Sequence, residues 1–128
     1  MQKSATRTWL AAGVLALSAS VFASAALAEC DEDQEDMVGK AIAAAASAKI
    51  APVVAGQSKQ MINLETCDTA GAGMVAQFKF NVIGADGLYW VTGTAKVSGG
   101  QVADMKFQAL SPNLAAASAK SGVKLASN

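Results

Sequence analysis

The two cysteines are the residues of this chain whose type is best suited to covalent chemistry. Cys30 and Cys67 are the only cysteines among the 128 residues, and the chain contains no histidine. Without histidine there is no Ser–His or Cys–His pair to activate a nucleophile, and the commonest transition-metal ligand is absent. Two cysteines most simply pair in an oxidising compartment, which the N-terminal segment described below indicates. We therefore expect a Cys30–Cys67 disulfide, which the chain-entropy model values at up to about 4 kcal/mol.

The acidic run at residues 29–36 (ECDEDQED) is the second feature with chemical potential, because closely spaced carboxylates bind calcium. Three of its acids have the spacing of the first three ligands of an EF-hand loop. The glycine that such a loop needs at its sixth position is Asp36 here, and the bidentate acid needed at the twelfth is Ile42. We therefore interpret the run as the solvated start of a helix. The sequence predicts no metal site, no cofactor and no catalytic residue.

Residues 1–28 have the three-part pattern of a secretory signal peptide. Lys3 and Arg7 form a basic start, residues 9–22 are uncharged and mostly apolar, and the segment ends in Ala-Leu-Ala. Small side chains at those last positions fit a signal peptidase. We expect cleavage after Ala28 and an exported protein, either periplasmic or extracellular.

Two alternatives to a cleaved signal remain open at this point. An uncleaved membrane anchor needs about 20 predominantly apolar residues, which is more than this stretch provides. A lipid on Cys30 needs a small residue before the cysteine, where this chain has Glu29. No later segment is long and apolar enough to predict a membrane span.

The part of the chain that follows the predicted cleavage site is small and weakly acidic. Its ten acids outnumber its eight bases, so its net charge is −2, and it contains no arginine. About 100 residues make one domain with a modest core. We place this domain at residues 29–110, followed by an Ala/Ser-rich tail at residues 111–128 that is either a short helical turn or disordered. Without a basic patch to neutralise phosphates, we expect a protein partner and no nucleic acid.

The residues after the acidic run predict one helix over positions 33–50. Apolar side chains recur there at three- and four-residue spacing, which places them on one face. Acids lie at the N-terminal end and Lys49 at the C-terminal end, as the helix dipole favours, and Pro52 stops the helix. The expected buried face is mostly alanine and comprises Met37, Val38, Ala41, Ile42, Ala45 and Ala48.

Three later segments with a two-residue apolar period predict strands, at residues 74–83, 88–97 and 101–110. Short glycine-rich turns join them as antiparallel neighbours. A weaker strand precedes them at residues 56–66, and residues 68–73 form a loop. The expected inward side chains are Ile62 and Leu64, then Met74, Ala76, Phe78, Phe80 and Val82, then Tyr89, Val91, Ala95 and Val97, and finally Ala103, Met105, Phe107 and Ala109.

These elements predict an α+β fold, in which one N-terminal helix packs on a four-stranded antiparallel meander sheet. The sheet has one apolar face that must be covered, and the helix is the available cover. Gly93 lies in the middle of a predicted strand, where glycine marks a bulge or a close backbone approach.

Two short segments resemble the cystatins, whose plan is also a helix with an antiparallel sheet wrapped on it. Residues 52–56 (PVVAG) look like the Q-V-V-A-G hairpin of that family, with Pro52 in place of glutamine. Residues 87–97 (GLYWVTGTAKV) resemble the strand after the second hairpin in stefin-type cystatins. The resemblance covers about residues 33–97. It implies a wedge-shaped inhibitor that enters the cleft of papain-like cysteine peptidases without a general base or a metal.

The candidate partner-binding residues come from these two segments. Trp90 is a large aromatic next to a turn, and an exposed tryptophan is often a binding anchor; the alternative is a strand residue packed at the sheet edge or under the tail. The full candidate set is Val53, Val54, Ala55, Gly56, Tyr89 and Trp90.

We expect an exported, non-catalytic binding or assembly module that uses a sheet face or edge. The alternative is a cystatin-like inhibitor of papain-type peptidases, which requires residues 53–56 to form an exposed hairpin tip. The second alternative is a small-ligand carrier with a cavity between helix and sheet, against which the alanine-rich helix face argues.

Overall fold

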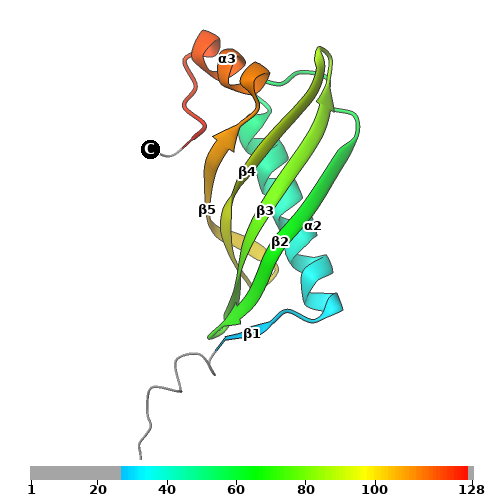
Figure 1. Cartoon of the computed structure of the whole chain (residues 1–128), viewed down its shortest axis with the longest axis vertical. Coiled ribbons are helices and arrows are strands. Elements are labelled where there is room, and N and C mark those ends of the chain that lie inside the picture. The colour runs from blue at the N-terminus through cyan, green and yellow to red at the C-terminus, as the bar shows by residue number, and fades with distance from the viewer. Residues whose placement is uncertain (1–26, 127–128) are drawn as a thin grey trace, which may run out of the picture.

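The structure, a computed structural model, describes residues 27–126, and the predicted signal peptide lies almost entirely outside these residues. Two helices and five strands make up the described part (Figure 1). In chain order they are β1 (Leu27–Glu29), α2 (Glu32–Ile50), β2 (Gln60–Ala70), β3 (Gly73–Gly84), β4 (Gly87–Ser98), β5 (Gln101–Leu110) and α3 (Pro112–Ser121).

Helix α2 begins where the acidic run supplies a cap. The Asp31 side chain accepts a hydrogen bond from the Gln34 backbone N–H at 2.8 Å, and the Asp31 backbone N–H donates to the Gln34 side chain at 2.9 Å. This reciprocal capping box satisfies two donors that the first turn would otherwise leave unpaired. The helix therefore starts at Glu32, one residue before the predicted start, and ends at Ile50 as predicted.

The buried stripe of α2 follows a four-residue spacing. Val38 and Ile42 are buried as predicted, but the stripe continues through Ala46 and Ile50, while Ala48 is exposed. The predicted face is therefore correct at its N-terminal half and rotated at its C-terminal half. The stripe packs on one face of the sheet, which we call the inner face.

The sheet is an antiparallel meander of five strands in the order β1-β2-β3-β4-β5, so the prediction of four strands is corrected by the short strand β1. Its residues pair with the far end of β2, from Leu27 opposite Ala70 to Glu29 opposite Asp68. Strand β2 begins at Gln60, four residues later than predicted, and ends at Ala70, four residues later than predicted. It therefore takes up half of the loop expected at residues 68–73. The reason is the partner that β1 provides, since a backbone with a pairing partner on each side continues as a strand.

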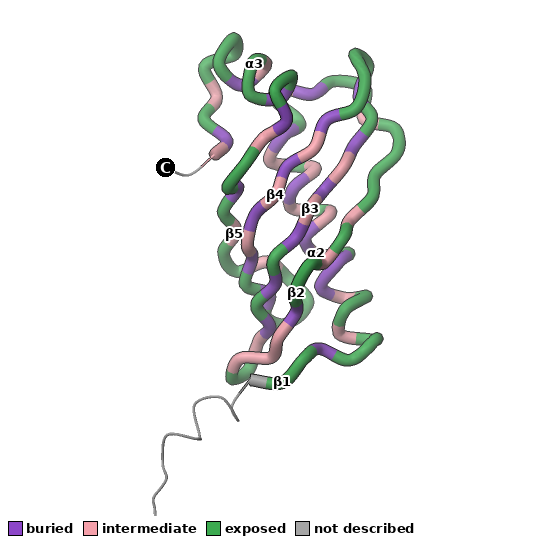
Figure 2. The backbone as a smooth tube through the Cα atoms, viewed as in Figure 1, coloured by how far each residue is buried: buried purple, intermediate pink, exposed green. Residues whose placement is uncertain are grey.

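Strands β3 and β4 have the inward faces that their two-residue period predicts. Every expected inward side chain of these two strands is buried, and Phe78 and Phe80 are fully buried between the sheet and α2. The alternation of buried and exposed positions is visible along both strands (Figure 2). On β2, Ile62 and Leu64 are half-buried and pack against the core.

The inward face of β5 differs from the predicted one. Ala103 and Ala109 are exposed, whereas Val102 and Leu110 lie against the core beside Met105 and Phe107. The register between β4 and β5 shifts at two places, and each extra residue moves the following side chains to the other face. One shift lies between Thr92 and Gly93, which agrees with the expected bulge at Gly93.

The Ala/Ser-rich tail forms α3 and then returns to the sheet. Ser111 is buried before the helix, and Leu114 and Leu125 are buried in the same core as the strands. Ala126 makes an isolated parallel bridge with Phe107. The tail therefore closes the end of the core that α2 leaves open, and it is part of the packed domain (Figure 1). None of the helices in the described residues is long and apolar enough to cross a membrane.

Candidate partner-binding surface

The two cysteines form the predicted disulfide. The Cα atoms of Cys30 and Cys67 are 5.4 Å apart and the sulfurs are bonded. The Cys30 backbone N–H also donates to the Cys67 carbonyl at 2.9 Å. Both side chains are buried, so the bond ties the start of α2 to β2 and offers no thiol for reaction. Among residues 27–126, no group of three or more acidic, cysteine or histidine side chains is arranged around a shared point.

Residues 53–56 form a connection between α2 and β2, and not the exposed hairpin tip that a cystatin-like wedge requires. The backbone N–H groups of Val53 and Val54 both donate to the Ile50 carbonyl at 2.9 Å, which extends the helix end by a turn. Val54 is 2 % exposed and belongs to the core, while Val53 is half-buried. Their apolar side chains are therefore already partnered within the domain.

The second half of this connection rests on the turn between β3 and β4. The Ala55 carbonyl accepts a hydrogen bond from the Ala85 N–H at 2.9 Å. Ala55 and Gly56 are exposed, and Gly56 has a positive φ of 67° that suits glycine. Of the four candidates in this segment, these two alone are available at the surface, and neither offers a large side chain.

Tyr89 and Trp90 lie on opposite faces of β4. Tyr89 is buried on the inner face, so it is a core residue and not a contact for a partner. Trp90 is half-buried on the opposite face, which we call the outer face. The Lys79 ammonium lies 5.1 Å from the centre of its ring, an arrangement in which the ring quadrupole attracts the cation. The Trp90 backbone is fixed by the tail, since its carbonyl accepts the Ser111 N–H at 2.9 Å.

Three large apolar side chains lie exposed around Trp90, on the same end of the sheet. Met61 is 66 % exposed, Ile83 is 41 % exposed and Leu88 is 56 % exposed. The register places Met61 opposite Asn81, Asn81 opposite Trp90, and Ile83 opposite Leu88. We call Met61, Ile83, Leu88 and Trp90 the outer patch.

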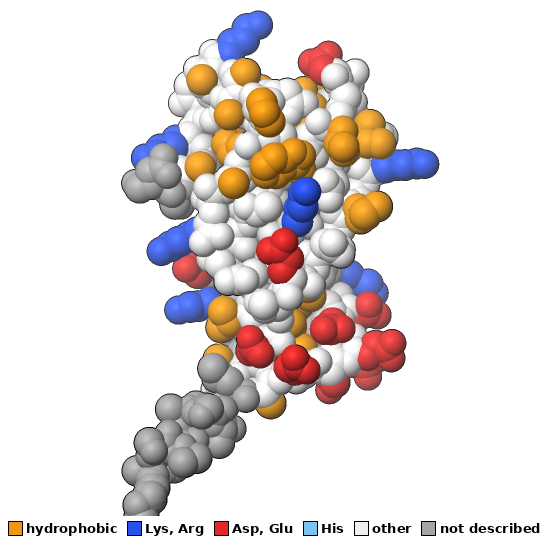
Figure 3. All heavy atoms as spheres, in the orientation of Figure 1, with side chains coloured by type: hydrophobic (Ala, Val, Ile, Leu, Met, Phe, Trp, Pro, Cys, Tyr) orange, Lys and Arg blue, Asp and Glu red, His pale blue; other side chains and the backbone are white. Residues whose placement is uncertain are grey.

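Figure 3 views the outer face directly. Apolar side chains gather toward the end that carries α3, and acidic side chains gather at the opposite end, near the start of α2. A hollow of about 280 Å³ lies within the apolar end, and Met61, Asn81, Ile83 and Leu88 are among the residues that line it.

Sequence reasoning found Trp90 but missed the other three members of the outer patch. The sequence does mark two of these positions as unusual. Ile83 and Leu88 flank the turn between β3 and β4, on the face that the two-residue period assigns to solvent. One exposed apolar side chain on that face is ordinary, but several close together mark an interaction surface.

Helix α2 and the sheet are packed closely at the end that carries α3. The space between α2, the sheet and α3 at this end has no room for a water molecule. Its walls are Ile50, Phe80, Val82, Tyr89, Trp90, Val91 and Leu114.

No family model, no curated protein and no solved structure matches this chain. The outer patch can bury apolar side chains of a partner and exclude water from them, with Lys79 and Asn81 as the polar groups inside it.

Proposed function

We propose that this protein is an exported, non-catalytic binding module, and that the outer patch holds an apolar segment of another protein. The observation that supports this proposal is the exposure of Met61, Ile83 and Leu88 beside Trp90 on a face that α2 does not cover. Exposed apolar clusters with a central aromatic are what binding hot spots consist of.

The surroundings of the patch support a protein partner more than a small molecule. The hollow at Ile83 and Leu88 is open to the surface and is formed by strands that hydrogen bonding holds in place. Small ligands are usually enclosed over most of their surface, whereas a protein partner can cover an open patch of this kind. A disulfide-tied domain with a rigid sheet also orders few groups on binding, which reduces the entropic cost.

The experiment compares capture of proteins from the exported fraction by the wild-type chain, by Leu88→Lys and by Val75→Lys. Val75 is exposed on the same face but at the other end of β3, so Val75→Lys adds the same charge outside the patch. We expect a partner that binds wild type and Val75→Lys, and whose affinity for Leu88→Lys is at least about tenfold weaker.

Binding of the purified partner is then measured through the emission of Trp90. The chain has two tryptophans, and the other, Trp9, lies within the predicted signal. Burial of Trp90 by an apolar segment should shift its emission to shorter wavelength. Equal binding of all three proteins, or binding without a change at Trp90, would show that the outer patch is not the binding surface.

A further inference from the structure

A second surface lies along the free edge of β2, next to the outer patch, and Met61 belongs to both. Strand β2 pairs with β3 along its whole length, but within residues 27–126 its other side is paired only from Asp68 to Ala70. The stretch from Gln60 to Leu64 is therefore a sheet edge. Edges of this kind offer unpaired backbone groups to another strand.

The hydrogen bonds show which residues of this edge offer their backbone. The Lys59 carbonyl accepts a hydrogen bond from the Ile83 N–H, so Lys59 faces β3. In an antiparallel pair, successive residues face alternate sides. Gln60, Ile62 and Leu64 therefore direct both backbone groups outward, whereas Met61 and Asn63 direct theirs to β3.

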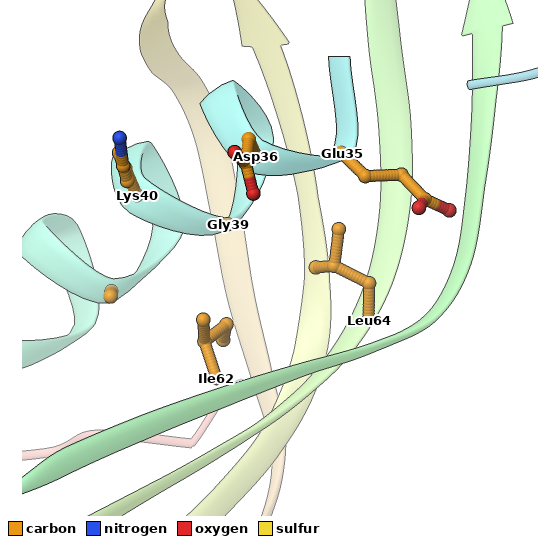
Figure 4. A pocket seen from close by; sticks show the side chains of 7 residues that line it. Glu35, Asp36, Gly39, Lys40, Ile62 and Leu64 are labelled. Atoms are coloured by element: carbon orange, nitrogen blue, oxygen red, sulfur yellow. The ribbon is translucent and has the colours of Figure 1, made fainter. Parts of the chain in front are cut away.

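A groove follows this edge on the side of α2. Ile62 and Leu64 point from β2 toward the helix, and Gly39 and Ala43 form the opposite wall (Figure 4). The groove has a volume of about 360 Å³. Glu35, Asp36 and Lys40 also line the groove from α2. The small residues Gly39 and Ala43 leave space for side chains from an added strand.

We propose that this edge pairs with the same edge of a second copy of the chain, antiparallel and centred on Ile62. In this register Ile62 faces Ile62 of the other copy, and Gln60 faces Leu64. These are the residues whose backbone groups point outward, so each pair exchanges two backbone hydrogen bonds. The two sheets then join into one continuous sheet around a two-fold axis, with an identical surface from each copy.

Charge complementarity selects the second copy and this register. Lys59 and Glu65 lie three residues before and after Ile62, and both are exposed. The two-fold axis at Ile62 brings Lys59 of each copy opposite Glu65 of the other. Opposite charges across a strand pair stabilise it, and like charges destabilise it. Moving the centre by one residue in either direction places Lys59 opposite Asn63 or Cys67, and the charge pair is lost.

Between Lys59 and the bulge at Glu65, the edge carries no feature that natural proteins use to prevent such pairing. Neither a proline nor a charged residue interrupts the sequence Gln60-Met61-Ile62-Asn63-Leu64. The bulge in β2 follows this stretch directly, and Glu65 is the residue at the bulge. An unprotected apolar edge is a hazard for aggregation unless a partner covers it, and a closed dimer covers both edges at once.

The test measures self-association of the disulfide-bonded protein, recovered from the exported fraction, by sedimentation equilibrium. We expect a reversible dimer at high protein concentration that weakens as salt screens the charges. Lys59→Glu and Glu65→Lys should each weaken the dimer about tenfold, because each places like charges opposite one another twice. The double variant Lys59→Glu/Glu65→Lys should restore wild-type association, since it recreates both pairs in reverse.

Both substituted positions are exposed, so these variants keep the fold, and amide hydrogen exchange provides a second readout. Dimerisation should slow exchange at Gln60, Ile62 and Leu64 and leave Met61 and Asn63 unchanged. A chain that stays monomeric up to millimolar concentration would overturn the proposal, as would a double variant that remains impaired. A dimer whose affinity is unchanged in the Lys59 and Glu65 variants, but which is lost in Leu88→Lys, would place the interface on the outer patch instead. Pairing of this edge with a strand of a different protein, in a chain that does not self-associate, would likewise overturn it.

Discussion

At the scale of single residues, the structure separates candidates that look alike in the sequence. Val54 and Trp90 are both apolar and both next to a turn, yet Val54 is in the core and Trp90 is half-exposed on the outer face. The difference arises because the Val54 side chain meets Gly84, whose missing Cβ leaves room for it. A side chain that is packed in this way cannot also enter the cleft of another protein.

Replacing Val54 with aspartate tests this assignment. Because Val54 is buried, Val54→Asp places a charge in the core without a partner and should lower the free energy of unfolding by several kcal/mol. Chemical denaturation provides the measurement. Ala55→Asp is the matched control, since Ala55 is exposed and the same change there should shift stability by about 0.5 kcal/mol or less. A stable, papain-inhibiting protein that loses inhibition in a folded Val54→Asp variant would instead support the wedge.

Gly93 provides a second prediction at this scale. A Cβ at this position would overlap the Lys106 carbonyl oxygen, which is backbone and has no alternative rotamer. Gly93→Ala should therefore force β4 and β5 apart and destabilise the domain by about 1–3 kcal/mol. In the control Gly39→Ala, the new Cβ meets Ile62 at an ordinary 3.4 Å, and alanine favours the helix by up to about 1 kcal/mol. Thermal melts that rank the two variants the other way would contradict this explanation.

At the scale of elements, the disulfide decides how the start of the domain is held. Cys30 precedes Asp31, the residue that caps α2, and Cys67 lies where β2 meets β1. The bond thus joins the capped end of the helix to the sheet, beside a short strand that pairs through three residues alone.

Reduction of this bond should lower the free energy of unfolding by about 2–4 kcal/mol, because the loop between the cysteines gains freedom in the unfolded chain. The measurement compares denaturation of oxidised and reduced protein, with a thiol count to establish the state of each. Hydrogen exchange should report that protection is lost first at the N-terminal turn of α2. Identical free energies of unfolding for the two forms would show that the hydrogen bonds around the cysteines hold this part of the domain without the disulfide.

Cleavage after Ala28 would remove two of the three residues of β1. Glu29 would keep its place opposite Asp68, and Cys30 would keep its hydrogen bond and its disulfide to Cys67. We therefore expect the form that begins at Glu29 to be folded, and mass spectrometry of the exported protein to find Glu29 at its N-terminus. An intact Met1 or a lipid on Cys30 would contradict the signal assignment.

At the scale of the whole molecule, the tail completes a core that the helix and sheet leave open at one end. Leu114 and Leu125 insert into the same cluster as Phe107. The tail also holds the edge of β4 near Trp90 through Ser111, so it links the core to the outer patch.

Leu114→Ala should therefore cost about 2–5 kcal/mol, as for other buried leucines, and should also move the emission of Trp90. Ala116→Ser, on the exposed side of α3, is the control and should leave both quantities nearly unchanged. Denaturation followed by fluorescence measures the two effects together. A Leu114→Ala variant with wild-type stability would show that the tail does not contribute to the packed core.

The sequence by itself determined the features that depend on local periodicity and on how many residues of a type the chain contains. Two cysteines in a chain allow one intramolecular pair, and the two-residue period of β3 and β4 identified every inward side chain of both strands. These signals hold because side chains of a regular strand alternate strictly between its faces.

The tertiary structure alone decided the features that depend on partners distant in sequence. The bulges of β5 arise from its register with β4, and each reversed the faces that a strict period predicts. The short strand β1 exists because β2 provides a partner, and the alanine-rich tail is buried through two leucines that fill the open end of the core. The outer patch likewise depends on the assembled sheet, which brings together Met61, Ile83 and Leu88 from three strands. The free edge of β2 depends on β1 being too short to cover it. A local pattern reports which face a side chain takes, but the neighbouring elements determine whether that face is covered.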